Sequence, residues 1–110
     1  MSKEWTTVCS AQDLIRGAGV CVLFNDEQVA IFQDMKGEHL YALSNFDPFG
    51  EANVLSRGII GSLGEKAVVA SPLYKQHFCL ESGLCIEDES VSVPSYSIRK
   101  EGEYIQLSKP

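Results

Sequence analysis

Three residues in the last third of the chain carry side chains that could bind a metal ion. His77, Cys79 and Cys85 supply an imidazole and two thiols, which are the ligands that zinc prefers in proteins. A structural zinc site needs a fourth ligand, and no fourth His or Cys lies at a usual zinc spacing from these three. The pattern therefore does not favour a metal site, and the sequence predicts no metal ligands.

A second group of residues has the types needed for nucleophilic catalysis. Ser71, His77 and Asp47 could be written as the nucleophile, base and orienting acid of a serine hydrolase. Ser71 precedes a proline, however, and lacks the Gly-x-Ser-x-Gly turn that presents such a nucleophile. The chain also offers no Gly-rich nucleotide loop, Cys cluster or haem motif, so we expect neither catalytic nor cofactor-binding residues in it.

The overall charge limits the classes of partner. The formal net charge of the 110 residues is −6, which opposes binding to the phosphates of nucleic acids or to anionic lipid surfaces. No apolar run is long enough to span a bilayer, and the first residues do not read as a secretory signal. We expect a cytoplasmic protein that binds neither nucleic acid nor membrane.

The four cysteines fit a reducing compartment. Each one lies in an apolar, strand-like context, where a free thiol behaves as a small buried hydrophobic group. We expect free packing residues at Cys9, Cys21, Cys79 and Cys85.

The elements that must position these side chains are short β-strands. Runs rich in Val, Ile, Tyr and Phe recur between turn signals, and no long segment has the helical period of about 3.6 residues. We expect strands at residues 5–9, 20–24, 28–33, 40–44, 58–61, 67–70, 77–80, 84–86, 95–100 and 103–107. About ten short strands in residues 1–110 predict a single all-β domain, an antiparallel sandwich or barrel.

Turn residues separate these runs. Short hairpins are predicted at 25–26 and 101–102, and residues that tolerate positive φ at Gly37, Gly64 and Gly83. Ser10 and Asp13 predict the cap of one short helix, with one or two turns through residues 14–16. The stretch 45–57 is the longest without a clean strand pattern, and we expect a functional loop there.

Two loops of this predicted domain carry a further pattern. The first reads Ser44-Asn45-Phe46-Asp47-Pro48-Phe49-Gly50, and the second contains Ser71-Pro72-Leu73-Tyr74 before a strand. They resemble the two loops of Rieske ferredoxins, where Cys-x-His and Cys-Pro-x-His hold a [2Fe–2S] cluster through two thiolates and two imidazoles. The resemblance implies a Rieske-like (ISP-type) fold. It puts the four ligand positions at Asp47, Phe49, Ser71 and Tyr74, none of which is Cys or His, and so implies no cluster.

A narrower resemblance rests on residues 26–32, 44–49, 54–58, 70–73 and 83–89. These segments are similar to the small subunit of cytoplasmic NAD(P)H-dependent nitrite reductases. The resemblance implies an accessory subunit that is not catalytic by itself and whose partner is the large subunit. In that family the large subunit carries FAD, a [4Fe–4S] cluster and sirohaem, and the pair reduces nitrite to ammonium.

The residues at the two loops have alternative interpretations. Asp47 before Pro48 is typical of a turn, and we expect Phe49 and Tyr74 to fill the space a cluster would take, because a cavity of that size is costly. The candidates for contact with the large subunit are Phe46, Pro48, Arg57, Lys75 and His77. The cations among them could equally be ordinary solubilising residues, and His77 an exposed strand residue.

Two alternatives to the accessory subunit remain to be compared for the whole chain. A working ferredoxin would need Cys and His at positions 47, 49, 71 and 74, which the sequence lacks. A free-standing Rieske-like module for another oxidoreductase stays open. The acidic run at residues 87–89 is either a solvated loop or a charged docking edge.

Overall fold

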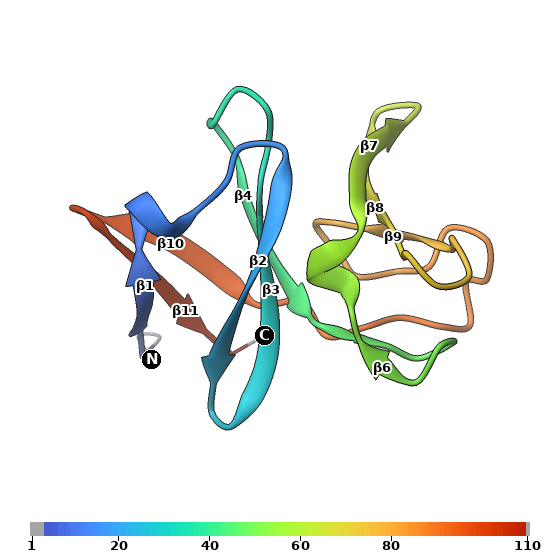
Figure 1. The fold of residues 1–110 in the computed structure, drawn as a ribbon, viewed down its shortest axis with the longest axis horizontal. Coiled ribbons are helices and arrows are strands. Elements are labelled where there is room, and N and C mark those ends of the chain that lie inside the picture. Colours follow the sequence, from blue (N-terminus) through green and yellow to red (C-terminus); the bar gives the residue numbers. More distant parts are fainter. Residues whose placement is uncertain (1–3, 110) are drawn as a thin grey trace.

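The computed structural model describes residues 4–109 as an all-β chain with two single-turn 3-10 helices. Figure 1 shows the strands in two groups, with β1–β4, β10 and β11 on one side and β6–β9 on the other. In chain order the elements are β1 (Thr6–Ser10), η1 (Ala11–Asp13), β2 (Ala18–Phe24), β3 (Glu27–Gln33), β4 (Leu40–Ser44), β5 (Phe46–Asp47), β6 (Ala52–Asn53), η2 (Leu55–Arg57), β7 (Ile59–Leu63), β8 (Lys66–Ala70), β9 (His77–Cys79), β10 (Ser97–Glu101) and β11 (Tyr104–Ser108).

The strands form antiparallel sheets, as predicted. Three sheets have three strands each, in the orders β1-β11-β10, β2-β3-β4 and β7-β8-β9, and β5 pairs with β6 alone. Neighbours in the sequence pair in most cases, because short turns join antiparallel strands directly. Among the described residues 4–109, the one long-range pairing within the sheets joins β1 to β11.

Strand β3 lies between two hydrophobic clusters. Its residues alternate in direction, so Val29 and Ile31 pack in one cluster with Ile105 and Leu107, whereas Ala30 and Phe32 pack in the other. The second cluster also holds Leu55, Val69, Phe78, Leu80 and Cys85. Both faces of β3 are therefore buried, and this explains its continuous apolar run.

The predicted hairpin turns are confirmed. Asn25 and Asp26 both have positive φ, 52° and 64°, as a two-residue type I′ turn between β2 and β3 requires. Gly102 turns β10 into β11 with φ 63°. Positive φ is also found at Gly37, Gly64 and Gly83.

The structure differs from the prediction at three places. The predicted helix is the single turn η1, capped by Ser10 and Asp13 as expected, but Leu14 is already extended and the turn does not reach residues 14–16. A second turn, η2, and the two-residue strands β5 and β6 lie in the stretch predicted as a loop. Residues 84–86 form only isolated bridges, from Leu84 to Ser92 and from Cys85 to Phe78.

The cysteines are unpaired, but only two are buried. Cys79 and Cys85 lie in the interior and Cys9 is half-buried, whereas the prediction of a buried residue is wrong for the exposed Cys21. The Cys21 thiol lies on the solvent side of β2, where its neighbours still withdraw enough water to raise its pKa. Within residues 4–109, no helix is long and apolar enough to cross a membrane.

Candidate functional site

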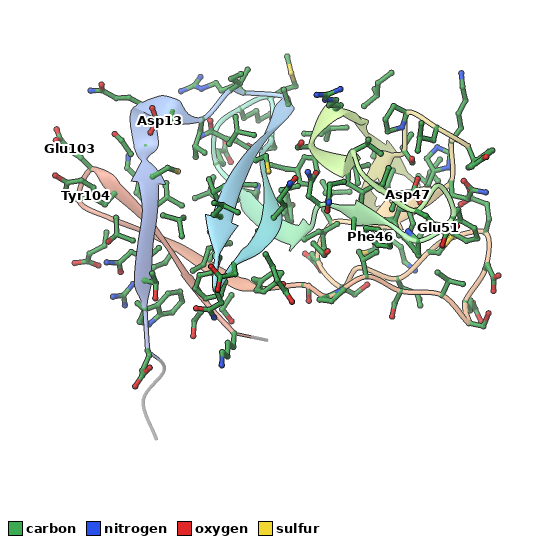
Figure 2. The ribbon with its side chains drawn as sticks, turned by 60° about the horizontal axis from the view of Figure 1, so that its bottom comes forward. Asp13, Phe46, Asp47, Glu51, Glu103 and Tyr104 are labelled. Atoms are coloured by element: carbon green, nitrogen blue, oxygen red, sulfur yellow. The ribbon has the colours of Figure 1, made fainter. Side chains whose placement is uncertain are left out.

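The first candidate loop is the β5–β6 hairpin, in which Phe46 pairs with Asn53 and Asp47 with Ala52. Asp47 is completely buried. Its Oδ1 accepts hydrogen bonds from the backbone N–H groups of Phe49 at 2.8 Å and Gly50 at 3.3 Å, which closes the turn predicted at Asp47-Pro48. Figure 2 shows Phe46, Asp47 and Glu51 at the opposite end of the molecule from Asp13, Glu103 and Tyr104.

The second loop joins β8 to β9 and begins at Ser71, which is also buried. Two backbone bonds close it, from Ser71 N to the Gln76 carbonyl at 2.9 Å and from Lys75 N to the Ser71 carbonyl at 3.1 Å. The Ser71 hydroxyl donates a short hydrogen bond to Asp47 Oδ2. The two loops are thus joined at positions 47 and 71, the two that the Rieske resemblance assigns to cysteine ligands.

Phe49 fills space beneath the loops, as expected. Its half-buried ring packs against the cluster around Phe78, with the two ring centroids 6.2 Å apart.

The expectation for Tyr74 is wrong, because 66% of its surface is exposed. Leu73 approaches the first loop in its place: a Cβ on Gly50 would come within 2.2 Å of Leu73 Cδ1. The chain turns at Lys75, which has a left-handed φ of 64°, and the phenol of Tyr74 remains in solvent. Leu73 is itself 45% exposed, so neither of the two side chains fills the interior as Phe49 does.

His77 belongs to a separate interaction. Its backbone N–H donates to Glu87 Oε1 at 2.7 Å, and its ring Nδ1 lies 2.5 Å from Glu87 Oε2. Burial raises the pKa of Glu87, but the two His77 contacts outweigh it and hold that pKa below its usual value. His77 is therefore paired with Glu87 and is not an ordinary exposed strand residue, whereas residues 87–89 are all exposed, as expected for a solvated loop.

This pairing also bears on the hydrolase interpretation of the sequence. Ser71 and Asp47 lie together, but the Ser71 hydroxyl donates to Asp47 and the His77 ring is held by Glu87, so the three do not form a hydrolase triad. Among residues 4–109, no group of three or more His, Cys, Asp or Glu side chains is arranged to hold a metal ion.

Asn45 is a structural residue of the site that sequence reasoning missed. Its buried amide donates to Gln28 Oε1 at 3.0 Å and accepts from the backbone N–H of Ser56 at 2.6 Å. Its own backbone bonds to the Gln28 carbonyl and to the N–H of Leu55. Asn45 thereby fixes η2 and the start of the β5–β6 hairpin against β3. The only signal in the sequence was a polar residue directly after an apolar strand.

The predicted contact residues lie around these loops with different exposure. Phe46, Arg57 and Lys75 are exposed, whereas Pro48 and His77 are half-buried. Arg57 is the last residue of η2, and Lys75 lies in the β8–β9 loop. The non-glycine residues with left-handed φ near the site are Glu51, at 52°, and Lys75.

The donor set at the four ligand positions does not fit a [2Fe–2S] cluster. Such a cluster needs thiolate and imidazole ligands. Position 47 is a carboxylate engaged in three hydrogen bonds, and position 71 is a hydroxyl bonded to it. Phe49 has no donor atom, and Tyr74 offers a phenol that points into solvent. The hydrogen bonds of Asp47 and Ser71 hold the two loops together at these positions.

Comparisons with known proteins agree on one family. A family model described as "Rieske-like [2Fe-2S] domain" matches residues 4–108. The nitrite reductase (NADH) small subunit of Salmonella typhimurium is 47% identical over 104 residues, which cover 94% of this chain and 96% of that protein. The solution structure of the nitrite reductase [NAD(P)H] small subunit from Erwinia carotovora has a TM-score of 0.82 at 45% identity, covering 96% of this chain and 82% of that one.

A third relative is much longer. A segment of the nitrite reductase [NAD(P)H] large subunit of Klebsiella oxytoca is 35% identical over 100 residues, which are 91% of this chain but only 10% of that protein. A domain like this chain thus occurs within the same polypeptide as a large subunit.

Proposed function

Because the chain belongs to the family of Rieske-like [2Fe–2S] domains, and within it to the nitrite reductase small subunits, we propose that it is the accessory small subunit of an NAD(P)H-dependent nitrite reductase and holds no cluster of its own. It assists the reduction of nitrite to ammonium without catalysing it. The flavin, [4Fe–4S] cluster and sirohaem that this reaction needs belong to the large subunit. Residues 1–110 act as one domain in this role.

One observation carries the cluster-free part of the proposal. The loops that hold iron in cluster-binding members of the fold are closed here by the hydrogen bond between Asp47 and Ser71. This bond satisfies two buried polar groups that would otherwise face an apolar interior at considerable cost. The loops therefore need no metal to stay together.

The long relative supports the large subunit as the partner. When two binding modules share one chain, the linker raises their effective concentration and a weak contact suffices. In Klebsiella oxytoca the similar domain is part of the large subunit. This relationship favours nitrite reductase over an unrelated oxidoreductase as the partner.

We place the docking surface at the two loops, with Phe46, Pro48, Arg57 and Lys75 in contact and His77 in a supporting position. Phe46 offers an exposed ring and the two cations offer charge on an otherwise acidic chain. The His77 ring is held by Glu87, so its part is to fix the 86–89 segment beside the loops. The protein works in the cytoplasm, where free thiols such as Cys79 and Cys85 persist.

Iron analysis tests the cluster-free part. We expect the purified, aerobically or anaerobically prepared chain to contain no stoichiometric iron and to have no visible absorption. About two irons and two labile sulfides per chain would overturn it.

Reconstitution tests the partner. The large subunit is expressed with and without this chain, and NADH-dependent formation of ammonium from nitrite is measured together with complex formation on a sizing column. We expect co-elution and higher or longer-lasting activity with the chain present. The chain alone should reduce no nitrite. Absence of any complex would overturn the partner but would leave the cluster-free proposal intact.

A further inference from the structure

Strand β7 is an edge strand whose outer side is left uncovered. It pairs with β8 on one side, and within residues 4–109 no strand, bridge or loop bonds to the other side. In Figure 1 the β7–β8 hairpin projects from the rest of the molecule. An open strand edge presents unpaired N–H and C=O groups that can pair with another chain.

The other longer edges are protected. The 94–96 segment bonds to β4 through Ser44 N–H and Tyr96 N–H, and the 84–86 segment bonds to β9 through Cys79 N–H and Ile86 N–H. Strand β2 packs against η2, and β1 is interrupted by a bulge. Strand β10 ends in charged residues at 99–101. Strand β7 has neither a proline nor a charged side chain.

The hairpin register shows which groups point outward. Gly64, with φ 63°, and Glu65 form a two-residue turn, so Leu63 and Lys66 are the bonded pair next to it. In an antiparallel pair, bonded and non-bonded positions alternate. Gly61 and Ile59 therefore bond to β8, while Ile60 and Ser62 direct their N–H and C=O groups to the free side.

The side chains of β7 add a second observation. Ile59 is 78% exposed and Leu63 43% exposed, and both lie on the same face as Gly61. A Cβ on Gly61 would meet nothing within 4 Å, and its φ is not positive. Every other glycine has either a positive φ or a neighbour that a Cβ would strike. No contact within the chain accounts for Gly61, and a glycine inside a strand often marks the close approach of another backbone.

We propose that β7 pairs with β7 of a second copy of this chain, running antiparallel about a two-fold axis at Gly61. The outward groups of Ile60 and Ser62 are placed symmetrically about Gly61. In this register Ile60 of one copy lies opposite Ser62 of the other, and four backbone hydrogen bonds form. Ile59 lies opposite Leu63 of the second copy on the exposed face, and the two sheets become one sheet with the order β9-β8-β7-β7-β8-β9.

Charge complementarity supports a second copy as the occupant. The same register brings Arg57, just before β7, toward Glu65 of the second copy, just after its β7. The two-fold axis repeats this pair at both ends of the contact. Because only one strand and its turn take part, the interface is small, and we expect a weak, concentration-dependent dimer rather than a permanent one.

A pair of substitutions at Ser62 tests the contact on the isolated chain. The Ser62 N–H points outward, so Ser62→Pro breaks no bond of the hairpin, and proline is tolerated on such an edge. It removes two of the four intermolecular bonds, so we expect the dimer Kd from sedimentation to rise by about tenfold or more. Ser62→Ala keeps the N–H and should leave the Kd unchanged. Amide exchange at Ile60 and Ser62 should slow as the wild-type concentration rises.

A charge exchange tests the register. Arg57→Glu should weaken the dimer, and Arg57→Glu combined with Glu65→Arg should restore it. Ile59→Lys offers a second way to block the edge if Ser62→Pro does not fold. The proposal is overturned by a monomer at every concentration, by a dimer that tolerates both Ser62→Pro and Ile59→Lys, or by β7 amides that gain protection only when the large subunit is added. The first two outcomes do not depend on the nitrite reductase assignment.

Discussion

Asp47 is a fully buried acidic side chain whose two oxygens are engaged in three hydrogen bonds. A buried carboxylate is costly unless donors surround it, and here a hydroxyl and two backbone N–H groups do so. Its burial is therefore part of the structure that joins the two loops.

Replacing Asp47 should destabilise the fold substantially. Asp47→Ala leaves the Ser71 hydroxyl and the N–H groups of Phe49 and Gly50 buried without partners, and we expect a loss of about 3 kcal/mol in the free energy of unfolding. Urea denaturation followed by Trp5 fluorescence measures it. Glu51→Gln, in the same turn but exposed, should change stability by less than about 0.5 kcal/mol. Equal effects of the two substitutions would contradict the role given to Asp47.

The loop between β3 and β4 should titrate as a unit. The ring of His39 and the backbone N–H groups of His39 and Glu38 hold the pKa of Asp34 at about 2, and the hydrogen bond to Asp34 raises the pKa of His39. The contribution of Asp34 to the free energy of unfolding is present above its unfolded pKa of about 3.9. It is lost as the pH falls toward 2. The contribution of His39 to the free energy of unfolding is fully present below its unfolded pKa of about 6.5. It is lost as the pH rises through the raised pKa of the folded state.

An NMR titration of the His39 ring checks this pair. In the wild type its pKa should lie above the ordinary value, and in Asp34→Asn it should return toward that value. An unchanged His39 pKa in Asp34→Asn would show that the ring does not depend on this carboxylate.

Single residues were predictable where their neighbours in the sequence decide the outcome. Asp47 before Pro48 specified a turn, and Ser10 with Asp13 specified a cap. Tyr74 and His77 were not predictable in this way. Tyr74 is turned outward by the left-handed backbone at Lys75, and His77 is held by Glu87, ten residues away in the sequence.

At the scale of elements, hydrophobic pattern and turn residues identified the long strands, because both signals are local. The apolar run of β3 and the Asn25-Asp26 turn are examples. Strands β5 and β6 have two residues each, too few for any period, and η2 depends on the hydrogen bonds of Asn45. The two loops were marked in the sequence by the family's spacing and not by periodicity.

The β8–β9 loop offers a prediction that separates stability from docking. Lys75 has a left-handed φ, which a non-glycine residue adopts at a cost, so Lys75→Gly should leave stability unchanged or raise it by about 0.5 kcal/mol. The same change removes a cation from the proposed docking surface and should weaken binding to the large subunit, measured by calorimetry. Glu51→Gly relieves the same backbone strain without loss of a cation, and it should not weaken binding. If the two variants bind the large subunit with equal affinity, Lys75 is not part of the docking surface.

At the scale of the molecule, the chain is a Rieske-like scaffold with two hydrophobic clusters that share strand β3. The cluster around Phe32 and Phe78 lies beneath the two loops and includes Leu55, which is held by the backbone of Asn45. The loops therefore rest on a packed base. Their relative position is fixed by this base as well as by the bond between Asp47 and Ser71.

Introducing the cluster ligands of Rieske ferredoxins tests whether the two loops keep the relative position that a cluster requires. The variant Asp47→Cys, Phe49→His, Ser71→Cys and Tyr74→His should take up about two irons per chain when iron and sulfide are supplied. The control with only Asp47→Cys and Phe49→His should not form a stable cluster, because one loop provides half of the ligands. Iron, labile sulfide and visible absorption are measured. A full variant without iron would contradict the assignment of the four ligand positions.

The bond between Asp47 and Ser71 has a consequence for how this protein is made in the cell. A loop closure built from carboxylate and hydroxyl groups forms as soon as the polypeptide has folded, and it needs no scaffold protein, carrier or delivered metal. Scarcity of iron, or oxygen that destroys exposed clusters, would leave such a chain intact. If the chain holds no cluster, as proposed above, its abundance would follow its synthesis alone.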